Sequence, residues 1–270
     1  MWYFILFAIV AGYAAWRWDA ARKRRVALLS APLSDEDWDA VLEMVPIVAK
    51  MPLALQGRLH GKVNLFLDQV SIYGKGGLDV DRDMELSIAA QACLLIVNTD
   101  AWYKTLKTVL LYPGAFRPRR PKRDGFLVHE DKSVVLGESW THGPVILSWP
   151  HAEQGAINDV DGHNVVIHEF AHQLDALSGH TDAVPILSSG QDFGTWEAVM
   201  MEGYDRHLAN VERRRKTVLD EYGATNYVEF LAVSIEVFFE KPKKLQREYP
   251  ELYSQIALLL RLDPLTWNEG

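Results

Sequence analysis

The alternation of hydrophobic and polar positions predicts helices over most of the chain. Helical periodicity covers 53–70 and 81–97, and it returns from Asn164 to the C-terminus, with loops near 178–190 and 220–226. A further helix is expected to begin at Ser34, whose hydroxyl can cap a first turn that carries acidic residues. Helices therefore dominate the predicted architecture.

A cluster of short β-type runs separates the helical parts. The run 106–112 ends at a Pro-Gly pair, and 134–137 and 143–149 read as two further short strands. The glycine-rich stretch 71–77 lacks the Lys-Ser/Thr ending of a phosphate-binding loop and is predicted to be a turn. Helices, then a small strand cluster, then helices again predict an α+β fold with a small sheet.

The N-terminus predicts a membrane anchor. The first sixteen residues carry no charge, aromatic residues lie near both ends of the apolar segment, and a basic cluster follows at 22–25. Counted through residue 21, the segment reaches the ~20 residues that a bilayer-spanning helix needs. Positive charge on the C-terminal side places the remainder in the cytoplasm. We expect an anchor at 1–21, a basic and polar hinge at 22–35 and one domain at 36–265; a buried or peripheral N-terminal helix is the alternative.

Composition narrows the chemistry. The 270 residues are 49% hydrophobic and 24% charged, which suits one large globular domain. A net charge of −8 disfavours nucleic acid as a partner, because phosphate binding needs a basic excess, and a short basic loop at 115–125 does not reverse this. Cys93 is the only cysteine and lies in an apolar run, so we expect it to be buried and inert, as fits a reducing compartment. Any metal site must then use histidine and carboxylate ligands.

One helix carries two histidines with metal-binding spacing. His168 and His172 stand four residues apart, so both imidazoles project from one helix face toward a single point. Glu169 lies one step round the helix, where it can reach a water beside the ion without being a ligand. This is the H-E-x-x-H arrangement of zinc metallopeptidases. The alternative is a solvated polar face, although a charged face on such an apolar helix is expensive to bury.

Spacing alone leaves the third ligand open. A catalytic zinc needs a third protein ligand and an open position for water, and a carboxylate on a later helix is expected to supply it. Glu229 is the best candidate, but Asn226 three residues earlier forms a capping-box-like pair with it, so ligand and cap are equally open. Glu236 is a minor competitor. Asp175, three residues after His172, is expected to accept a hydrogen bond from an imidazole N–H; a salt bridge or solvated acid is the alternative.

Six ordered sequence blocks resemble one family. The chain is similar to the MtfA (Mlc titration factor A) family of bacterial zinc metallopeptidases, of the gluzincin type, whose active site is similar to that of anthrax lethal factor. The resemblance covers about residues 40 to 265 in these blocks: GGLDVDRDMELSIAAQACLL, LYPGAF, LGESWTHGPVILSW, GHNVVIHEFAHQLD, EYGATNYVEFLAVSIEVFFEKP and YPELY...LDPL. It implies a mainly helical, zincin-like domain with its small sheet beside the HExxH helix, and one Zn²⁺.

The resemblance also implies residue roles. His168, His172 and Glu229 match the family's zinc ligands, and Glu169 matches its catalytic glutamate. Tyr222 matches a tyrosine near the zinc that assists catalysis; without the family it reads as a packing residue. The family's activity implies aminopeptidase-like hydrolysis of a peptide substrate. The anchor predicted at 1–21 is not a feature of the family; from the charge order at the N-terminus we expect it to tether a cytoplasmic catalytic domain to the inner membrane.

Two expectations about partners complete the prediction. Val145, Ile146 and Leu147 form a short run that can serve as an edge strand for an extended peptide; an ordinary core strand is the alternative. The family's namesake activity is capture of the repressor Mlc, which controls sugar uptake. A non-catalytic, membrane-bound protein that sequesters such a transcriptional repressor is therefore the rival function, although the retained Glu169 favours an enzyme.

Overall fold

The computed structural model describes residues 2–114 and 143–267. The strand expected at 134–137 and the basic loop at 115–125 lie outside the described residues. The elements in chain order are α1 (Trp2–Ser30), α2 (Asp35–Met44), α3 (Ile47–Lys50), α4 (Leu53–Gln69), β1 (Ser71–Gly74), α5 (Arg82–Leu94), β2 (Thr108–Tyr112), β3 (Val145–Ser148), α7 (Trp149–Ile157), α8 (Val165–Asp175), η1 (Ala176–Ser178), α9 (Phe193–Glu212), η2 (Glu221–Ala224), α10 (Tyr227–Glu240), α11 (Pro242–Glu248), α12 (Pro250–Leu260) and η3 (Pro264–Thr266).

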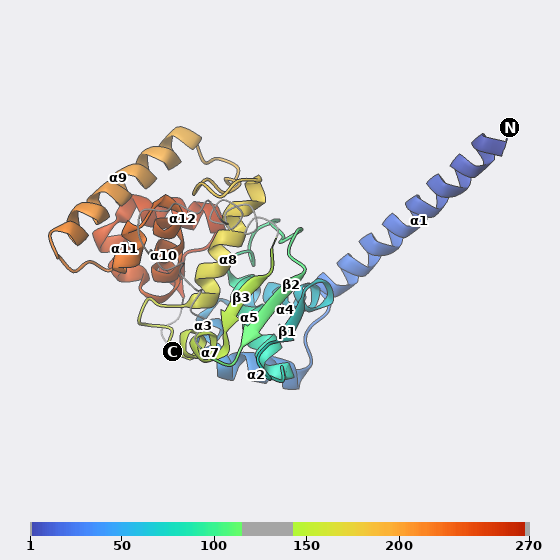
Figure 1. Cartoon of the computed structure of the whole chain (residues 1–270), viewed down its shortest axis with the longest axis horizontal. Helices are drawn as coiled ribbons and strands as arrows, with labels where there is room; N and C mark the ends of the chain where they lie inside the picture. The colour runs from blue at the N-terminus through green and yellow to red at the C-terminus, as the bar shows by residue number, and fades with distance from the viewer. Residues whose placement is uncertain (1, 115–142, 268–270) are drawn as a thin grey trace, which may run out of the picture.

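Helix α8 lies at the centre of the folded body. It contacts α5, α7 and β3, which precede it in the chain, and α10, which follows it. Helix α8 therefore joins the elements before it to the C-terminal helices. In Figure 1 the sheet lies next to α8, while α9 to α12 gather beyond it. The predicted mainly helical α+β architecture with a small sheet is confirmed.

The sheet has three parallel strands in the order β1-β2-β3. The turn expected at 71–77 was wrong for its first half, because Ser71–Gly74 form β1. This strand is too short to show an alternating pattern, and it exists because β2 lies beside it: Ser71 N donates to Lys107 O at 3.0 Å and Lys75 N donates to Leu111 O at 2.8 Å. The turn itself follows at Gly76 and Gly77, with φ of 61° and 85°.

Side-chain caps begin two of the helices, and the cap at Ser34 was predicted. Ser34 Oγ accepts from Asp37 N at 3.1 Å at the start of α2, and Asp81 Oδ1 accepts from Met84 N at 2.8 Å at the start of α5. Most of α5 is buried in the core, and Cys93 within it has no exposed surface. Burial raises the pKa of the Cys93 thiol far above its ordinary value. The prediction that Cys93 is buried is confirmed, and a thiol that keeps its proton is a poor nucleophile, as expected of an inert cysteine.

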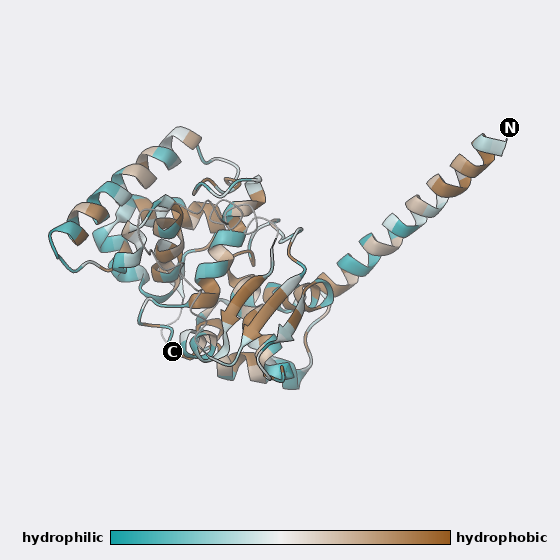
Figure 2. Ribbon diagram, in the orientation of Figure 1, coloured by the Kyte–Doolittle hydropathy of each residue, from teal (hydrophilic) through white to brown (hydrophobic). Residues whose placement is uncertain are grey.

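Helix α1 projects from the body as a single long rod (Figure 1). It continues through the basic cluster to Ser30, so residues 31–34 alone join it to α2. Its last turns pack on α4 so closely that a Cβ at Gly61 would lie 2.1 Å from Leu29 O. Nearer the N-terminus the side chains of α1 are exposed to solvent; Trp2 and Trp18, for example, are 82% and 70% exposed. By length and composition α1 can cross a membrane, and Figure 2 shows its apolar residues concentrated toward the N-terminal end.

Candidate metal centre and cleft

The HExxH helix is held at its start by Asn164. The side-chain oxygen of Asn164 accepts from Val166 N at 3.1 Å and Ile167 N at 3.0 Å, and its amide nitrogen donates to Gly155 O at 2.9 Å. The cap therefore fixes where α8 begins and ties it to α7. Buried apolar residues of α8, Phe170 among them, fix its rotation, so both histidines face α10.

The start of α10 brings Glu229 to the histidines. Asn226 Oδ1 accepts from Val228 N at 2.9 Å and from Glu229 N at 3.0 Å, so Asn226 caps the helix. The Glu229 carboxylate does not fold back onto this cap. Its Oε2 lies 3.0 Å from His168 Nε2 and 3.5 Å from His172 Nε2. The backbone of Glu229 thus belongs to the helix start, and its side chain belongs to the histidine cluster.

Three donor atoms converge with the spacing of zinc ligands. The two Nε2 atoms of His168 and His172 lie 3.2 Å apart, which with the Glu229 contacts completes a small triangle. Ligands held at 2.0–2.1 Å around a tetrahedral ion are separated by about 3.3–3.4 Å. Among the described residues this is the one cluster of three potential ligand groups. Two imidazoles and a carboxylate are a borderline-soft donor set that suits zinc.

The charges of the cluster favour a bound cation. Burial lowers the pKa of His168, but its hydrogen bonds to Glu229 and Glu236 prevail and raise the pKa to about 10. Burial likewise raises the pKa of Glu229, yet the two histidines beside it bring the pKa down to about 2. A positive charge between the two histidines and Glu229 is thus stabilised. A proton and a metal ion therefore compete for the same donor atoms.

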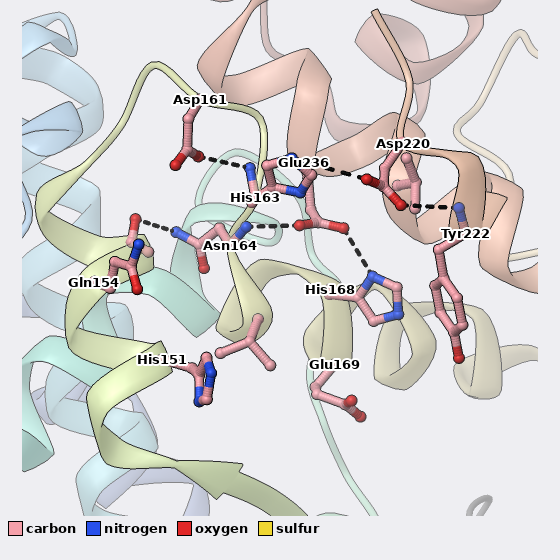
Figure 3. Close-up of a pocket in the computed structure, with 13 residues that line it drawn as sticks. His151, Gln154, Asp161, His163, Asn164, His168, Glu169, Asp220, Tyr222 and Glu236 are labelled. Atoms are coloured by element: carbon pink, nitrogen blue, oxygen red, sulfur yellow. Dashed lines mark hydrogen bonds and ion pairs between the residues drawn. The ribbon is translucent and has the colours of Figure 1, made fainter. Parts of the chain in front are cut away.

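Glu236 lies on the opposite side of the His168 ring. Its Oε1 is 2.8 Å from Nδ1, the nitrogen that faces away from Glu229 and His172. Its Oε2 accepts from Asn164 N at 2.6 Å, as Figure 3 shows. Glu236 is therefore a partner of a candidate ligand rather than a competing ligand.

A cleft of about 570 Å³ opens beside the cluster and is lined by His168, Glu169, Tyr222, His151, His163 and Asp220, among others. Burial raises the pKa of the Glu169 carboxyl above its ordinary value. Tyr222 is 52% exposed, and the centroid of its ring lies 5.9 Å from the centroid of the His168 ring. Figure 3 shows Glu169, His168 and Tyr222 along the same opening. Sequence reasoning did not identify His151, His163 or Asp220, because no spacing relates them to the HExxH helix.

The other expected site residues have different surroundings. Asp175 Oδ2 accepts from Ala183 N at 2.9 Å, and its buried Oδ1 has no hydrogen-bond partner, so the structure does not bring Asp175 onto an imidazole. In β3, Val145 and Leu147 are buried and Ile146 is half-buried. Within the described part of the chain, β3 pairs with β2 alone and is an edge strand.

Buried carboxylates make the stability of the fold depend on pH. Burial raises the pKa of Glu240 from 4.5 to about 8 and the pKa of Asp175 from 3.8 to about 6. The folded chain therefore keeps protons that the unfolded chain releases, and the free energy of unfolding falls as pH rises through this window. We expect Glu240→Gln to flatten that fall by up to about 1.4 kcal/mol per pH unit between roughly pH 5 and 8.

Urea unfolding at several pH values measures this slope. Glu153→Gln is the matched control, because Glu153 is exposed on α7. An unchanged slope for Glu240→Gln would mean that Glu240 keeps its charge in the folded chain.

Comparison with known proteins covers nearly the whole chain. The profile of Peptidase_M90, described as glucose-regulated metallo-peptidase M90, matches residues 18–261. An uncharacterized protein of Synechocystis sp. is 37% identical over 269 residues, which cover 97% of this chain and 96% of that protein. A protein of Yersinia pestis named Mlc titration factor A is 29% identical over 255 residues, 93% of this chain and 90% of its own. A Yersinia pseudotuberculosis protein of the same name matches equally well.

Proposed function

Because the chain belongs to the family of glucose-regulated metallo-peptidases M90, we propose that it is a zinc-dependent peptidase with aminopeptidase-like activity. The family match confirms the expected resemblance to the Mlc titration factor A proteins and supports a metallopeptidase. The observation that carries the proposal is the triangle of donor atoms from His168, His172 and Glu229, next to a cleft that His168 and Glu169 line.

In this proposal His168, His172 and Glu229 hold one zinc ion, and Glu169 is the general base. When bound, zinc would lower the pKa of a water toward ~7 and polarise the scissile carbonyl. Glu169 accepts the proton of the attacking water and returns it to the leaving amine. The raised pKa of Glu169 suits this exchange, because a carboxylate with a higher proton affinity is a stronger base.

The proposed role of Tyr222 is to donate its hydroxyl hydrogen to the oxyanion that develops on the substrate carbonyl. Its ring lies beside His168 at the cleft, which supports this role. We expect Tyr222→Phe to lower kcat by roughly 10²–10³-fold with little change in KM, because the donor acts chiefly in the transition state. Steady-state kinetics on an aminoacyl-anilide measure both constants. A rise in KM with unchanged kcat would instead make Tyr222 a substrate-binding residue.

The substrate is proposed to lie extended along β3. The backbone of Val145, Ile146 and Leu147 can pair with a peptide by strand addition, since β3 is at the edge of the described sheet and contacts α8. Such pairing uses hydrogen bonds to the backbone of the substrate and not to its side chains. It therefore suits a peptidase that accepts substrates with many different side chains.

Hydrolysis by the purified chain tests the proposal directly. We expect cleavage of aminoacyl-anilides that disappears on chelation and returns with added zinc. A zinc-loaded chain that cleaves neither anilides nor longer peptides would overturn it.

The name of the Yersinia relatives favours a second candidate function, capture of a transcriptional repressor of the Mlc type and thereby a link to sugar uptake. A repressor-binding surface needs no general base. Binding of the purified repressor, measured by calorimetry, should therefore survive Glu169→Gln, whereas peptidase activity should not.

We also propose that α1 tethers a cytoplasmic catalytic domain to the inner membrane. Its exposed apolar residues support this, and most of them lie before residue 18, where the match to the family model begins. We expect the full chain to sediment with lipid vesicles, and a chain lacking residues 1–21 to stay in solution with its zinc affinity unchanged. Retention of the shortened chain on vesicles would disprove the tether.

A further inference from the structure

Helix α10 presents two buried carboxylates to the segment that leads into α8. Glu236 and Glu240 are 5% and 6% exposed and stand one helical turn apart. Glu236 Oε2 accepts from Asn164 N at 2.6 Å, and Glu240 Oε2 accepts from Gly162 N at 2.7 Å and His163 N at 3.1 Å. Both side chains therefore fasten the same segment to the helix that carries Glu229.

Only one of the two also touches a candidate ligand. The second oxygen of Glu236 lies 2.8 Å from His168 Nδ1, whereas the second oxygen of Glu240 has no hydrogen-bond partner. A carboxylate accepts hydrogen bonds, so this contact requires the proton of a neutral His168 ring to sit on Nδ1. The Nε2 lone pair is then free, and Nε2 is the atom that faces His172 and Glu229.

We propose that Glu236 is a positioning residue for zinc: it holds His168 in the tautomer and ring orientation that present Nε2 to the ion. This inference rests on the proposed zinc site. It goes beyond that site because the two oxygens of one side chain join the ligand His168 to Asn164, the residue that caps the ligand's own helix. The rotation of the ring and the start of α8 are thus set by the same group on α10.

The chemistry of glutamine makes a sharp test. In Glu236→Gln the single amide oxygen can accept from Asn164 N, and the NH₂ group must then face His168 Nδ1. The Nδ1 atom becomes the acceptor and the ring proton moves to Nε2. A protonated Nε2 has no lone pair with which to bind zinc. The opposite orientation sets the NH₂ group against Asn164 N–H, so neither orientation keeps both native contacts.

Glu240→Gln is the matched control. Glu240 uses one oxygen for both of its backbone contacts, so a glutamine there can keep them and place its NH₂ group where the partnerless oxygen was. Both substitutions remove one buried carboxylate from the same helix and act on the same segment. A difference between them isolates the contact with His168.

The experiment measures the affinity of the full chain for zinc by competition with a chromophoric chelator, together with the absorption spectrum of the cobalt-loaded proteins. We expect Glu236→Gln to bind zinc about 10–100-fold more weakly than the parent and to alter the cobalt spectrum. Glu240→Gln should match the parent in both. Equal weakening in the two variants would mean that the carboxylates act only through the segment, and parent-like binding by Glu236→Gln would overturn the proposal.

Two further measurements keep the outcomes distinct. The melting temperature of each zinc-free protein shows whether it is folded. If Glu236→Gln is not folded, Glu236→Asp replaces it, because aspartate keeps two accepting oxygens and should bind zinc more tightly than Glu236→Ala. A loss for Glu236→Asp as large as for deletion of the side chain by alanine would then count against positioning. Failure of the parent itself to bind zinc would refute the proposed function instead.

Discussion

Glu169→Gln is expected to lower the kcat of peptide hydrolysis by roughly 10²–10⁴-fold while the protein still binds zinc as the parent does. Glutamine keeps the size of the side chain and cannot accept the proton of the attacking water. Glu169 is outside the triangle of donor atoms, so the ligand set is intact in the variant. Its pKa is raised by burial, and the substitution removes a charge that the folded chain holds at some cost. The variant should therefore be no less stable than the parent.

Zinc content and aminoacyl-anilide hydrolysis, measured side by side, check this prediction. Glu153→Gln is the control for loss of an acidic side chain, because Glu153 is exposed on the neighbouring helix α7 and does not line the cleft. Full activity in Glu169→Gln would remove Glu169 from the mechanism. Zinc binding without hydrolysis in both parent and variant would leave capture of a repressor as the better function.

Glu229→Gln is expected to weaken zinc binding by more than the roughly 10–100-fold typical of residues that only support a ligand. The substitution replaces a carboxylate by a neutral amide, whose oxygen is a much weaker zinc ligand, and it removes the negative charge that balances the ion. The Glu229 carboxylate lies 3.0 Å from His168 Nε2 and 3.5 Å from His172 Nε2, so in the variant the two imidazoles would supply most of the binding. Because a metal that binds only the folded chain stabilises it, added zinc should also cease to raise the melting temperature.

Chelator competition and melting curves with and without zinc measure the two effects. Glu221→Gln, an exposed substitution in η2 near the same site, is the control. If Glu229→Gln bound zinc like the parent and only melted earlier, Glu229 would serve the helix start alone. That result would restore the capping reading that its spacing from Asn226 allows.

Local patterns were sufficient for most of the helices and for part of the site. The i, i+4 spacing of His168 and His172 sets both on one face of any helix that contains them, and Asn164 and Asn226 begin their helices as predicted, because helix periodicity and capping depend on residues a few positions apart. Local spacing did not fix the role of Glu229, because it allowed either a helix cap or a zinc ligand. The resemblance to the family favoured the ligand before any geometry was known.

The tertiary structure decided everything that depends on how α8 and α10 cross. Glu229 and Glu236 lie 61 and 68 positions from His168, and only the packed helices set one on Nε2 and the other on Nδ1 of the same ring. Strand β1 likewise exists because β2 lies beside it, and Asp175 bonds the backbone of Ala183 because the loop after α8 folds back onto it. The sequence by itself determined which side chains could meet on one helix. The packing between helices determined which atoms did, since contacts across such separations have no local period to reveal them.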